Sequence, residues 1–205
     1  SNAVTSPGTN SVIISFPDIS NATASRIGVD IDVLVSDEPF ADALFHSNIL
    51  QAESQNTPAA TATGTDLTLI QIFAPDLTMT KGVQSTDNVN STVAPVAVPV
   101  DGNVTDADGG DVITYVISVE NTGGAEAYDL NIRDTRPTNL TNCTISSVAF
   151  ADGTTLTNPT NYTGDLFTTN LVLDNANPLQ ESDGVALNGQ DELYITYTCT
   201  CGIGV

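Results

Sequence analysis

The 205-residue sequence predicts an all-β protein of the β-sandwich class. Two runs within residues 110–137, at 113–119 and 128–132, alternate apolar with polar side chains, which is typical of half-buried strands. Asn, Thr and two Gly at 121–124 favour a turn between the runs, so we expect a hairpin-like unit there. The composition agrees, because Thr, Asn, Asp, Val and Gly dominate and Trp is absent.

Residues 110–137 also carry a recognisable pattern, G-D-x-I-T-Y-x-I-x-V-x-N-T-G-x-x-x-A-Y-D-L-x-I-x-D-T-x-P. This stretch resembles the conserved repeat of large bacterial surface antigens, which is related to the repeats of isopeptide-forming fimbrial proteins and adhesins. The resemblance implies immunoglobulin-like β-sandwiches in a tandem array at the cell surface. It implies no particular ligand.

The first part of the chain holds several candidate strands. Alternation predicts strands at 12–16 and, most clearly, at 27–35, and a further strand is expected at 67–73. Apolar residues within 36–48 favour a short helical turn, and the polar stretch 51–65 reads as a loop.

The second part begins after Pro75. LTMTKGV at 77–83 predicts a strand, and it resembles the phrase that opens a repeat in the surface-antigen family. Residues 84–110 read as loop with an edge strand at 93–100. After the proposed hairpin, further strands are predicted at 143–150, 166–173 and 192–201, and residues 174–190 between the last two are rich in turn-forming residues.

An internal similarity relates the two parts. Residues 11–20 and 27–37 resemble 168–179 and 191–201, with a period of about 160 residues. We therefore expect residues 1–3 to be a tag scar, 4–75 the closing part of one repeat and 76–205 the opening part of the next. Such parts leave sheet edges open. Either each part folds as an incomplete sandwich, or strands from 4–75 complete the later repeat, within one chain or in a strand-exchanged dimer.

The charge excludes one class of partner. Four basic residues against 25 acidic ones give a net charge of −21. Nucleic-acid binding needs clustered Lys and Arg, so we expect none. The acidic side chains either form a solvated surface or gather divalent cations.

Lys81 is the only lysine. In the strand at 77–83 it shares a face with Leu77, Met79 and Val83, and this face is expected to point inward. The family resemblance implies an amide crosslink between such a lysine and an asparagine, here Asn48, with Asp111 or Glu120 as the proton-shuttling acid. Because Asn48 precedes the later repeat, this crosslink requires strand exchange. The alternative is a lysine that reaches solvent or pairs with a carboxylate.

A Gly-rich acidic loop is the candidate calcium site. Ca²⁺ prefers six to eight oxygen ligands, and closely spaced Asp and Asn in a loop provide them. The alternative is an acidic turn, because the same residues favour turns. Two further acidic groups are weaker candidates, namely Asp174, Asn175 and Asn177, and Asp183, Asn188 and Asp191. The candidate calcium ligands are Asp101, Asn103, Asp106, Asp108 and Asp111.

The three cysteines are Cys143, Cys199 and Cys201. Alternation places Cys199 and Cys201 on one inward face, where free thiols pack as small hydrophobic groups. In an oxidising exterior, Cys143 pairs instead with one of the two and leaves the other free.

Together these features predict a structural spacer repeat of a large secreted or cell-surface, adhesin-like protein without catalytic turnover. Its expected partners are neighbouring repeats, and its expected location is extracellular. The alternative is an adhesion module that recognises a host or matrix protein or a glycan. We find no enzyme motif, since His46 has no second base or nucleophile in a recognisable phrase.

Overall fold

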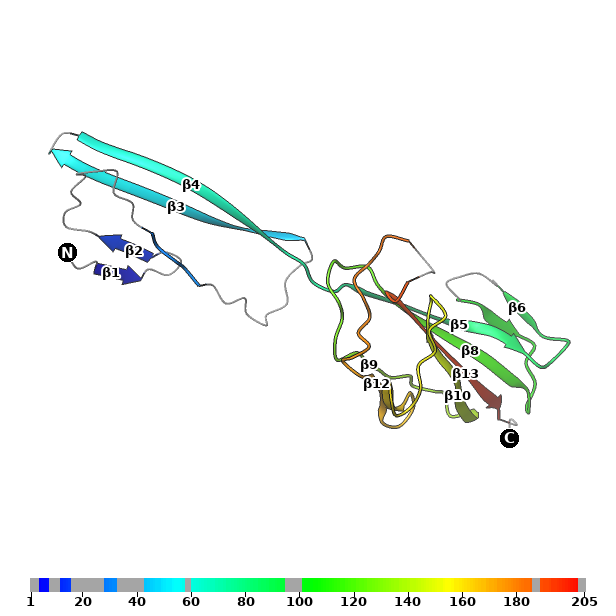
Figure 1. Cartoon of the computed structure of the whole chain (residues 1–205). Helices are drawn as coiled ribbons and strands as arrows, with labels where there is room; N and C mark the ends of the chain where they lie inside the picture. Colours follow the sequence, from blue (N-terminus) through cyan, green and yellow to red (C-terminus); the bar gives the residue numbers. More distant parts are fainter. Residues whose placement is uncertain are drawn as a thin grey trace. The chain divides into compact units, whose positions relative to one another are not determined.

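The computed structural model of the protein describes residues 4–7, 12–15, 28–32, 43–57, 60–94, 101–185 and 189–202. Every regular element in these ranges is a β-strand, which confirms the predicted all-β class (Figure 1). Within the same ranges, no helix is long and apolar enough to cross a membrane. The chain divides into two compact units, Ser1–Glu38 and Pro39–Val205.

In the first unit, β1 (Val4–Pro7) pairs antiparallel with β2 (Val12–Ser15). The strand predicted at 27–35 is wrong for its described portion, because residues 28–32 form no strand. Val29 and Ile31 are exposed there. Alternation marks residues that suit a strand, but a strand forms only where a neighbouring segment accepts its backbone hydrogen bonds.

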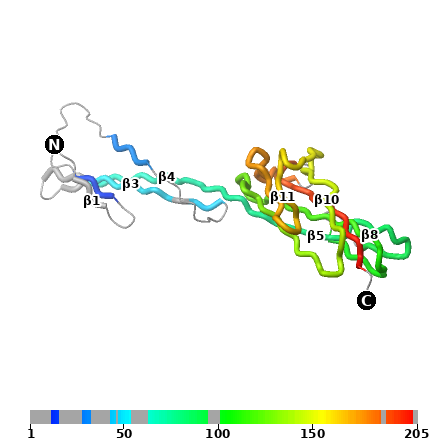
Figure 2. Tube along the Cα trace, turned by 90° about the horizontal axis from the view of Figure 1, so that it is seen from below, coloured from blue at the N-terminus to red at the C-terminus, as the bar shows by residue number. Residues whose placement is uncertain are grey.

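The second unit begins with a long antiparallel hairpin of β3 (Leu44–Thr57) and β4 (Ala60–Ile72), which lie side by side in Figures 1 and 2. The loop predicted at 51–65 and the helical turn predicted up to residue 48 are therefore wrong wherever the structure describes them. Thr61, Thr63 and Thr65 are β-branched, which favours strand despite their polarity.

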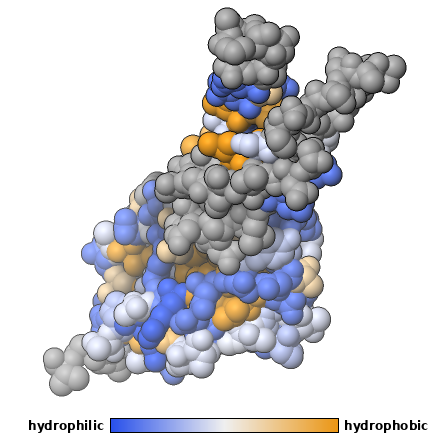
Figure 3. Space-filling view, turned by 90° about the vertical axis from the view of Figure 1, so that its left-hand side faces the viewer, coloured by the Kyte–Doolittle hydropathy of each residue, from blue (hydrophilic) through white to orange (hydrophobic). Residues whose placement is uncertain are grey.

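Large apolar side chains of this hairpin are exposed. In Figure 3 such side chains appear in orange at the molecular surface. These apolar side chains lie on both faces of the hairpin. The register pair of Ile49 and Leu67 lies on one face, and the pair of Leu44 and Ile72 lies on the other. The exposed large apolar residues of the hairpin are Leu44, Phe45, Ile49, Leu50, Leu67, Leu69 and Ile70.

Residues 77–94, 101–185 and 189–202 form what we call the two-sheet body. A four-stranded antiparallel sheet has the order β10-β13-β8-β5, and a three-stranded sheet has the order β11-β12-β9. A small two-stranded sheet joins β6 to β7. The strands are β5 (Leu77–Thr86), β6 (Thr92–Ala94), β7 (Asn103–Thr105), β8 (Val112–Asn121), β9 (Asn131–Ile132), β10 (Leu140–Phe150), β11 (Tyr162–Asp165), β12 (Asn170–Leu173) and β13 (Glu192–Cys201).

The predicted hairpin at 110–137 is wrong, because its two runs belong to different sheets. β8 pairs with β5 on one side and β13 on the other, so no free edge remains for β9. β9 pairs instead with β12. The turn at 121–124 therefore carries the chain from one sheet to the other. Of the remaining predictions, strands at 77–83, 143–150 and 192–201 are confirmed by β5, β10 and β13.

The core combines residues from both sheets, an arrangement consistent with a β-sandwich. Ile117 and Ile195 from the four-stranded sheet and Leu171 from the three-stranded sheet are almost wholly buried. The inward alternation of β13 follows the pattern expected for this strand. Truncating one of these residues to alanine would cost about 2–5 kcal/mol of unfolding free energy.

Candidate functional site

Lys81 makes an ion pair that connects the two sheets. It lies in β5 on the same face as its register partner Ile117, which is 2% exposed. Its Nζ atom is 2.7 and 2.8 Å from the two carboxylate oxygens of Asp134. Asp134 follows β9, and its backbone N–H donates to the Leu166 carbonyl at 2.8 Å. The carboxylate is thus held in the opposite sheet, where it receives the ammonium group of Lys81.

Two tyrosines complete this cluster. The Tyr197 hydroxyl donates a hydrogen bond to Asp134 Oδ2 at 2.5 Å. Lys81 Nζ lies 5.6 and 5.8 Å from the ring centroids of Tyr115 and Tyr197, within cation–π range. Burial, and then the Asp134 carboxylate, raises the pKa of Tyr197, so its hydroxyl remains a donor at neutral pH. We call Lys81, Tyr115, Asp134 and Tyr197 the Lys81 cluster.

The other crosslink candidates lie elsewhere. Asn48 is exposed in β3, opposite Thr68 of β4. Asp111 Oδ2 accepts hydrogen bonds from Asn88 Nδ2 at 2.8 Å and from the Asp108 N–H at 2.6 Å. Glu120 lies in β8, three register positions from Ile117. Lys81 instead contacts Asp134, Tyr115 and Tyr197, and the Lys81–Asn48 amide remains a prediction.

Asp134 is the functional residue that sequence reasoning missed. Asp134 belongs to the D-T-x-P motif at the end of the repeat-like pattern. A sequence motif does not show which side chain of the other sheet will lie next to it. A signal was nevertheless present. In a chain with a single inward lysine, an acidic residue that continues the alternation of an apolar run is the natural partner.

A buried asparagine anchors the start of the two-sheet body. The Asn121 side chain is fully buried, and its Oδ1 atom accepts hydrogen bonds from the N–H groups of Asp76 and Gly123, both at 3.1 Å. Its Nδ2 atom donates to the carbonyls of Ala125 at 2.7 Å and Gln180 at 2.8 Å. This carboxamide therefore fixes three separate segments at the end of β8.

The neighbouring glycines allow the preceding chain to approach closely. A Cβ atom on Gly123 would overlap the backbone of residues 74–76, and one on Gly124 would overlap the Phe73 ring. The Thr122 N–H donates to the Asp76 carbonyl at 2.7 Å, which adds a further contact. The segment 73–76 is thus held against the turn 121–124, and we call this contact the Asn121 clamp.

A disulfide joins Cys143 of β10 to Cys199 of β13. Cys143 lies within a register shift between these strands, so it faces Cys199 without a regular register partner. Cys201 is a free, partly buried thiol. Burial, followed by the nearby Asp111 and Asp87 carboxylates, raises the pKa of Cys201, which lowers its reactivity at neutral pH.

Hydrogen bonds hold the acidic loop at 101–111 to the segment 87–91. Besides the contacts of Asp111, the Val112 N–H donates to Asp87 Oδ1 at 2.8 Å and Ser91 Oγ donates to the Asp106 carbonyl at 2.9 Å. Asn103 belongs to β7. Over the described ranges, no three His, Cys, Asp or Glu side chains are grouped to hold a metal. The calcium prediction for Asp101, Asn103, Asp106, Asp108 and Asp111 remains untested.

Two surface cavities, of about 370 and 510 Å³, adjoin at Arg136. The Arg136 guanidinium lies 5.8 Å from the Phe167 ring centroid. Asp165 lines the smaller cavity, but its carboxylate accepts hydrogen bonds from the Phe167 and Thr168 N–H groups at 2.6 and 2.7 Å. Hydrogen bonds from Thr168 and Phe167 lower the pKa of Asp165, whose role is to shape this turn.

The geometry thus comprises an ion-pair cluster between sheets, a clamp at the start of the body and a disulfide near its other end. Each holds segments together, and each is assembled from strands distant in sequence. Comparison with known proteins returned no matching family model, no significantly similar curated protein and no significantly similar solved structure.

Proposed function

We propose that this chain is a structural spacer segment that transmits tension within a large extracellular, cell-surface protein of bacterial origin. The observation that carries this proposal is the strand order of the four-stranded sheet. β5 and β13 both pair antiparallel with β8, on its two sides, and therefore run parallel to each other.

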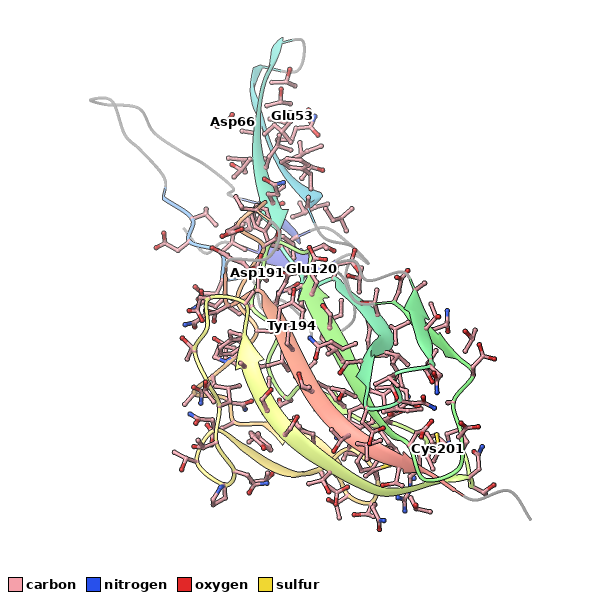
Figure 4. All side chains as sticks on the ribbon, turned by 90° about the vertical axis from the view of Figure 1, so that its right-hand side faces the viewer. Glu53, Asp66, Glu120, Asp191, Tyr194 and Cys201 are labelled. Carbon is pink, nitrogen blue, oxygen red and sulfur yellow. A yellow bond between two sulfur atoms is a disulfide. The ribbon has the colours of Figure 1, made fainter. Side chains whose placement is uncertain are left out.

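This order determines how tension acts on the sheet. The chain enters the body at the start of β5 and leaves it at the end of β13. In Figure 4, Glu120 and Asp191 mark one end of the sheet, and Cys201 marks the other. Pulling these ends apart slides β5 and β13 along β8. Ladder hydrogen bonds lie across the strands, so sliding strains many of them together, whereas peeling breaks them one at a time.

The three contacts described above support the same role. The Asn121 clamp holds the entering segment, the Lys81 cluster ties β5 to the opposite sheet, and the disulfide ties β13 to β10. Each opposes the displacement of a strand through which tension enters or leaves. A disulfide is also stable mainly in oxidising, extracellular compartments.

The finer features of the proposal rest on the repeat-like pattern at 110–137. We propose an immunoglobulin-like repeat whose partners are neighbouring repeats of the same chain. The open edges expected from the repeat boundaries are then covered by those neighbours, or by strand exchange between two copies. The function requires no catalytic turnover.

Single-molecule force spectroscopy tests this function. Handles attached at residues 75 and 202 pull β5 and β13 along β8. Handles at residues 75 and 122 instead peel β5 from β8, because Leu77 and Asn121 are register partners. We expect a clearly higher rupture force for the first pair of handles. Equal forces in the two directions would contradict the proposal.

An adhesion module is the second candidate, and Arg136 is the observation that favours it. This exposed cation lines both cavities in a strongly acidic chain. A host or matrix protein or a glycan with a carboxylate group would suit it. Binding to glycan arrays or immobilised matrix proteins that is lost in Arg136→Ala would support this function, and absence of binding by the parent chain would remove it.

A further inference from the structure

Asp191 is a buried carboxylate with one unsatisfied oxygen. The residue is 4% exposed and immediately precedes β13. Its carbonyl accepts a hydrogen bond from the Asn121 N–H at 2.8 Å, and its Oδ2 atom accepts one from the Asp183 N–H at 3.2 Å. Its Oδ1 atom is buried without a hydrogen-bond partner. Buried polar atoms are almost always paired, so this oxygen points to a missing partner.

Among the residues that the structure describes, no basic side chain supplies that partner. Among the described residues, the one ion pair is that of Lys81 with Asp134. Arg136 lies over Phe167. A buried carboxylate without a compensating charge is costly, because the interior solvates it far less well than water does.

A second carboxylate faces the same space. Asp183 Oδ1 accepts a hydrogen bond from the Val185 N–H at 2.7 Å. A Cβ atom built on Gly189 would collide with Asp191 Oδ1 and would lie 3.3 Å from Asp183 Oδ2. Both oxygens therefore approach the same side of Gly189, where the absence of a side chain lets the two carboxylates come near each other.

We propose that Asp183 and Asp191 bind a divalent cation, with Ca²⁺ as the ion that fits best. Carboxylate oxygens are hard ligands that suit Ca²⁺, which tolerates irregular geometry and completes its shell with water and carbonyl oxygens. Zn²⁺ is disfavoured, because neither nitrogen nor sulfur ligands are present at this site. With two carboxylates we expect weak binding, with a Kd of about 0.1–1 mM as in extracellular calcium modules.

This site is separate from the calcium loop predicted from the sequence. Asp191 precedes the first residue of β13, whereas the loop at 101–111 lies at the other end of that strand, where the Gly110 N–H donates to the Cys201 carbonyl. Figure 4 shows Asp191 and Cys201 at opposite ends of β13. Asn188, which the sequence groups with these two residues, lies outside the described residues.

Calcium-dependent melting of the full chain tests the proposal. The protein is freed of metals with a chelator and melted with increasing CaCl₂, and MgCl₂ at the same ionic strength controls for general screening of the acidic surface. Asp183→Asn changes an exposed side chain and should preserve folding, and Asp191→Asn is the buried counterpart. Asp108→Asn, in the loop at 101–111, is the matched control.

We expect calcium to raise the melting temperature of the parent chain and of Asp108→Asn, but not that of Asp183→Asn. Without calcium, Asp191→Asn should melt no lower than the parent chain, because the substitution removes an uncompensated buried charge. With calcium the order should reverse. Overturning results are an equal effect of Mg²⁺, no calcium effect at all, or a calcium effect that disappears only in Asp108→Asn.

Discussion

Lys81 Nζ lies 2.7 Å from Asp134 Oδ1, and this ion pair joins the first strand of the four-stranded sheet to the residue that follows β9 in the opposite sheet. The side chain of Asp134 is 9% exposed, whereas that of Lys81 is 38% exposed. The carboxylate therefore depends on its partners more than the ammonium group does, because the ammonium group retains access to water.

The Asp134→Asn variant should be less stable than the parent chain by about 1.5–3 kcal/mol, the usual cost of losing hydrogen bonds to a charged group. Lys81→Met should cost at least as much, because it leaves the buried Asp134 carboxylate without its charged partner, whereas the ammonium group left by Asp134→Asn still reaches water. Urea unfolding of both single variants and the double variant measures the coupling between the residues. Additive effects would show that the two side chains do not interact.

Intact mass should show Lys81 as an ion pair. Because its ammonium group pairs with Asp134, we expect a mass lower than that of the sequence by only the two hydrogens lost in the disulfide. Loss of one ammonia would demonstrate the Lys81–Asn48 amide instead. Loss of one water would demonstrate an amide between Lys81 and Asp134. The Lys81→Met variant is the control, because it can form neither amide and should show neither mass loss.

Removal of the disulfide should destabilise the two-sheet body. Cys143 and Cys199 are separated by 56 residues, so their bond restricts a long segment of the unfolded chain. The paired Cys143→Ala and Cys199→Ala substitutions should lower the unfolding free energy by about 2–4 kcal/mol. Reductant should then have no further effect on unfolding. Cys201→Ser is the control, and a comparable loss in that variant would contradict the assignment of Cys201 as the free thiol.

The Asn121 clamp should be sensitive to a single substitution. Asn121→Ala would leave the N–H groups of Asp76 and Gly123 without their acceptor. We expect a loss of more than about 2 kcal/mol in unfolding free energy, because the Gly123 N–H stays buried and the Asp76 N–H stays partly buried without an acceptor. Asn131→Ala, at an exposed position in β9, is the control. Similar losses in the two variants would contradict the role of the clamp.

Stability should fall at alkaline pH through Tyr197. Burial and then the Asp134 carboxylate raise the pKa of this phenol above its ordinary value of 10.0, so the folded state holds the proton more tightly than the unfolded state. The resulting stabilisation is fully present below pH 10 and is lost as the pH rises further.

Urea unfolding at neutral pH and above pH 10 measures this loss. Tyr197→Phe should be less stable at neutral pH and should lose less stability on the alkaline side. Both proteins should carry Cys201→Ser, because a thiolate at high pH would attack the disulfide. The same alkaline loss in both proteins would assign the effect to other tyrosines, such as Tyr115, whose pKa burial also raises.

The sequence predicted strands in the two-sheet body better than their pairing. Alternation located β8 and β13 because each has one face in the core. It could not show that β8 has neighbours on both sides, so the turn at 121–124 was interpreted as a hairpin. Strand pairing depends on contacts between distant residues, and local alternation does not encode it.

Polar strands and isolated side chains were the hardest features to predict. The Thr-rich segment of β4 resembled a loop, although β-branched residues suit strands. Lys81 was identified as chemically unusual from its sequence position alone. Its partner Asp134 emerged only when both sheets were in place. The sequence placed Asp183 and Asp191 in a weaker acidic group, but only the structure shows that one oxygen of Asp191 is buried without a partner.

The Cys143–Cys199 bond also sets how far the chain can lengthen if the body gives way. The residues between the two cysteines form a closed ring, so they add almost nothing to the distance between the chain ends. Fully extended, a segment of 56 residues would span about 190 Å, and that length stays withheld while the bond is intact. The unfolded chain is therefore shorter under tension when the disulfide is intact than when it is reduced, and the segments on either side of the body stay closer together.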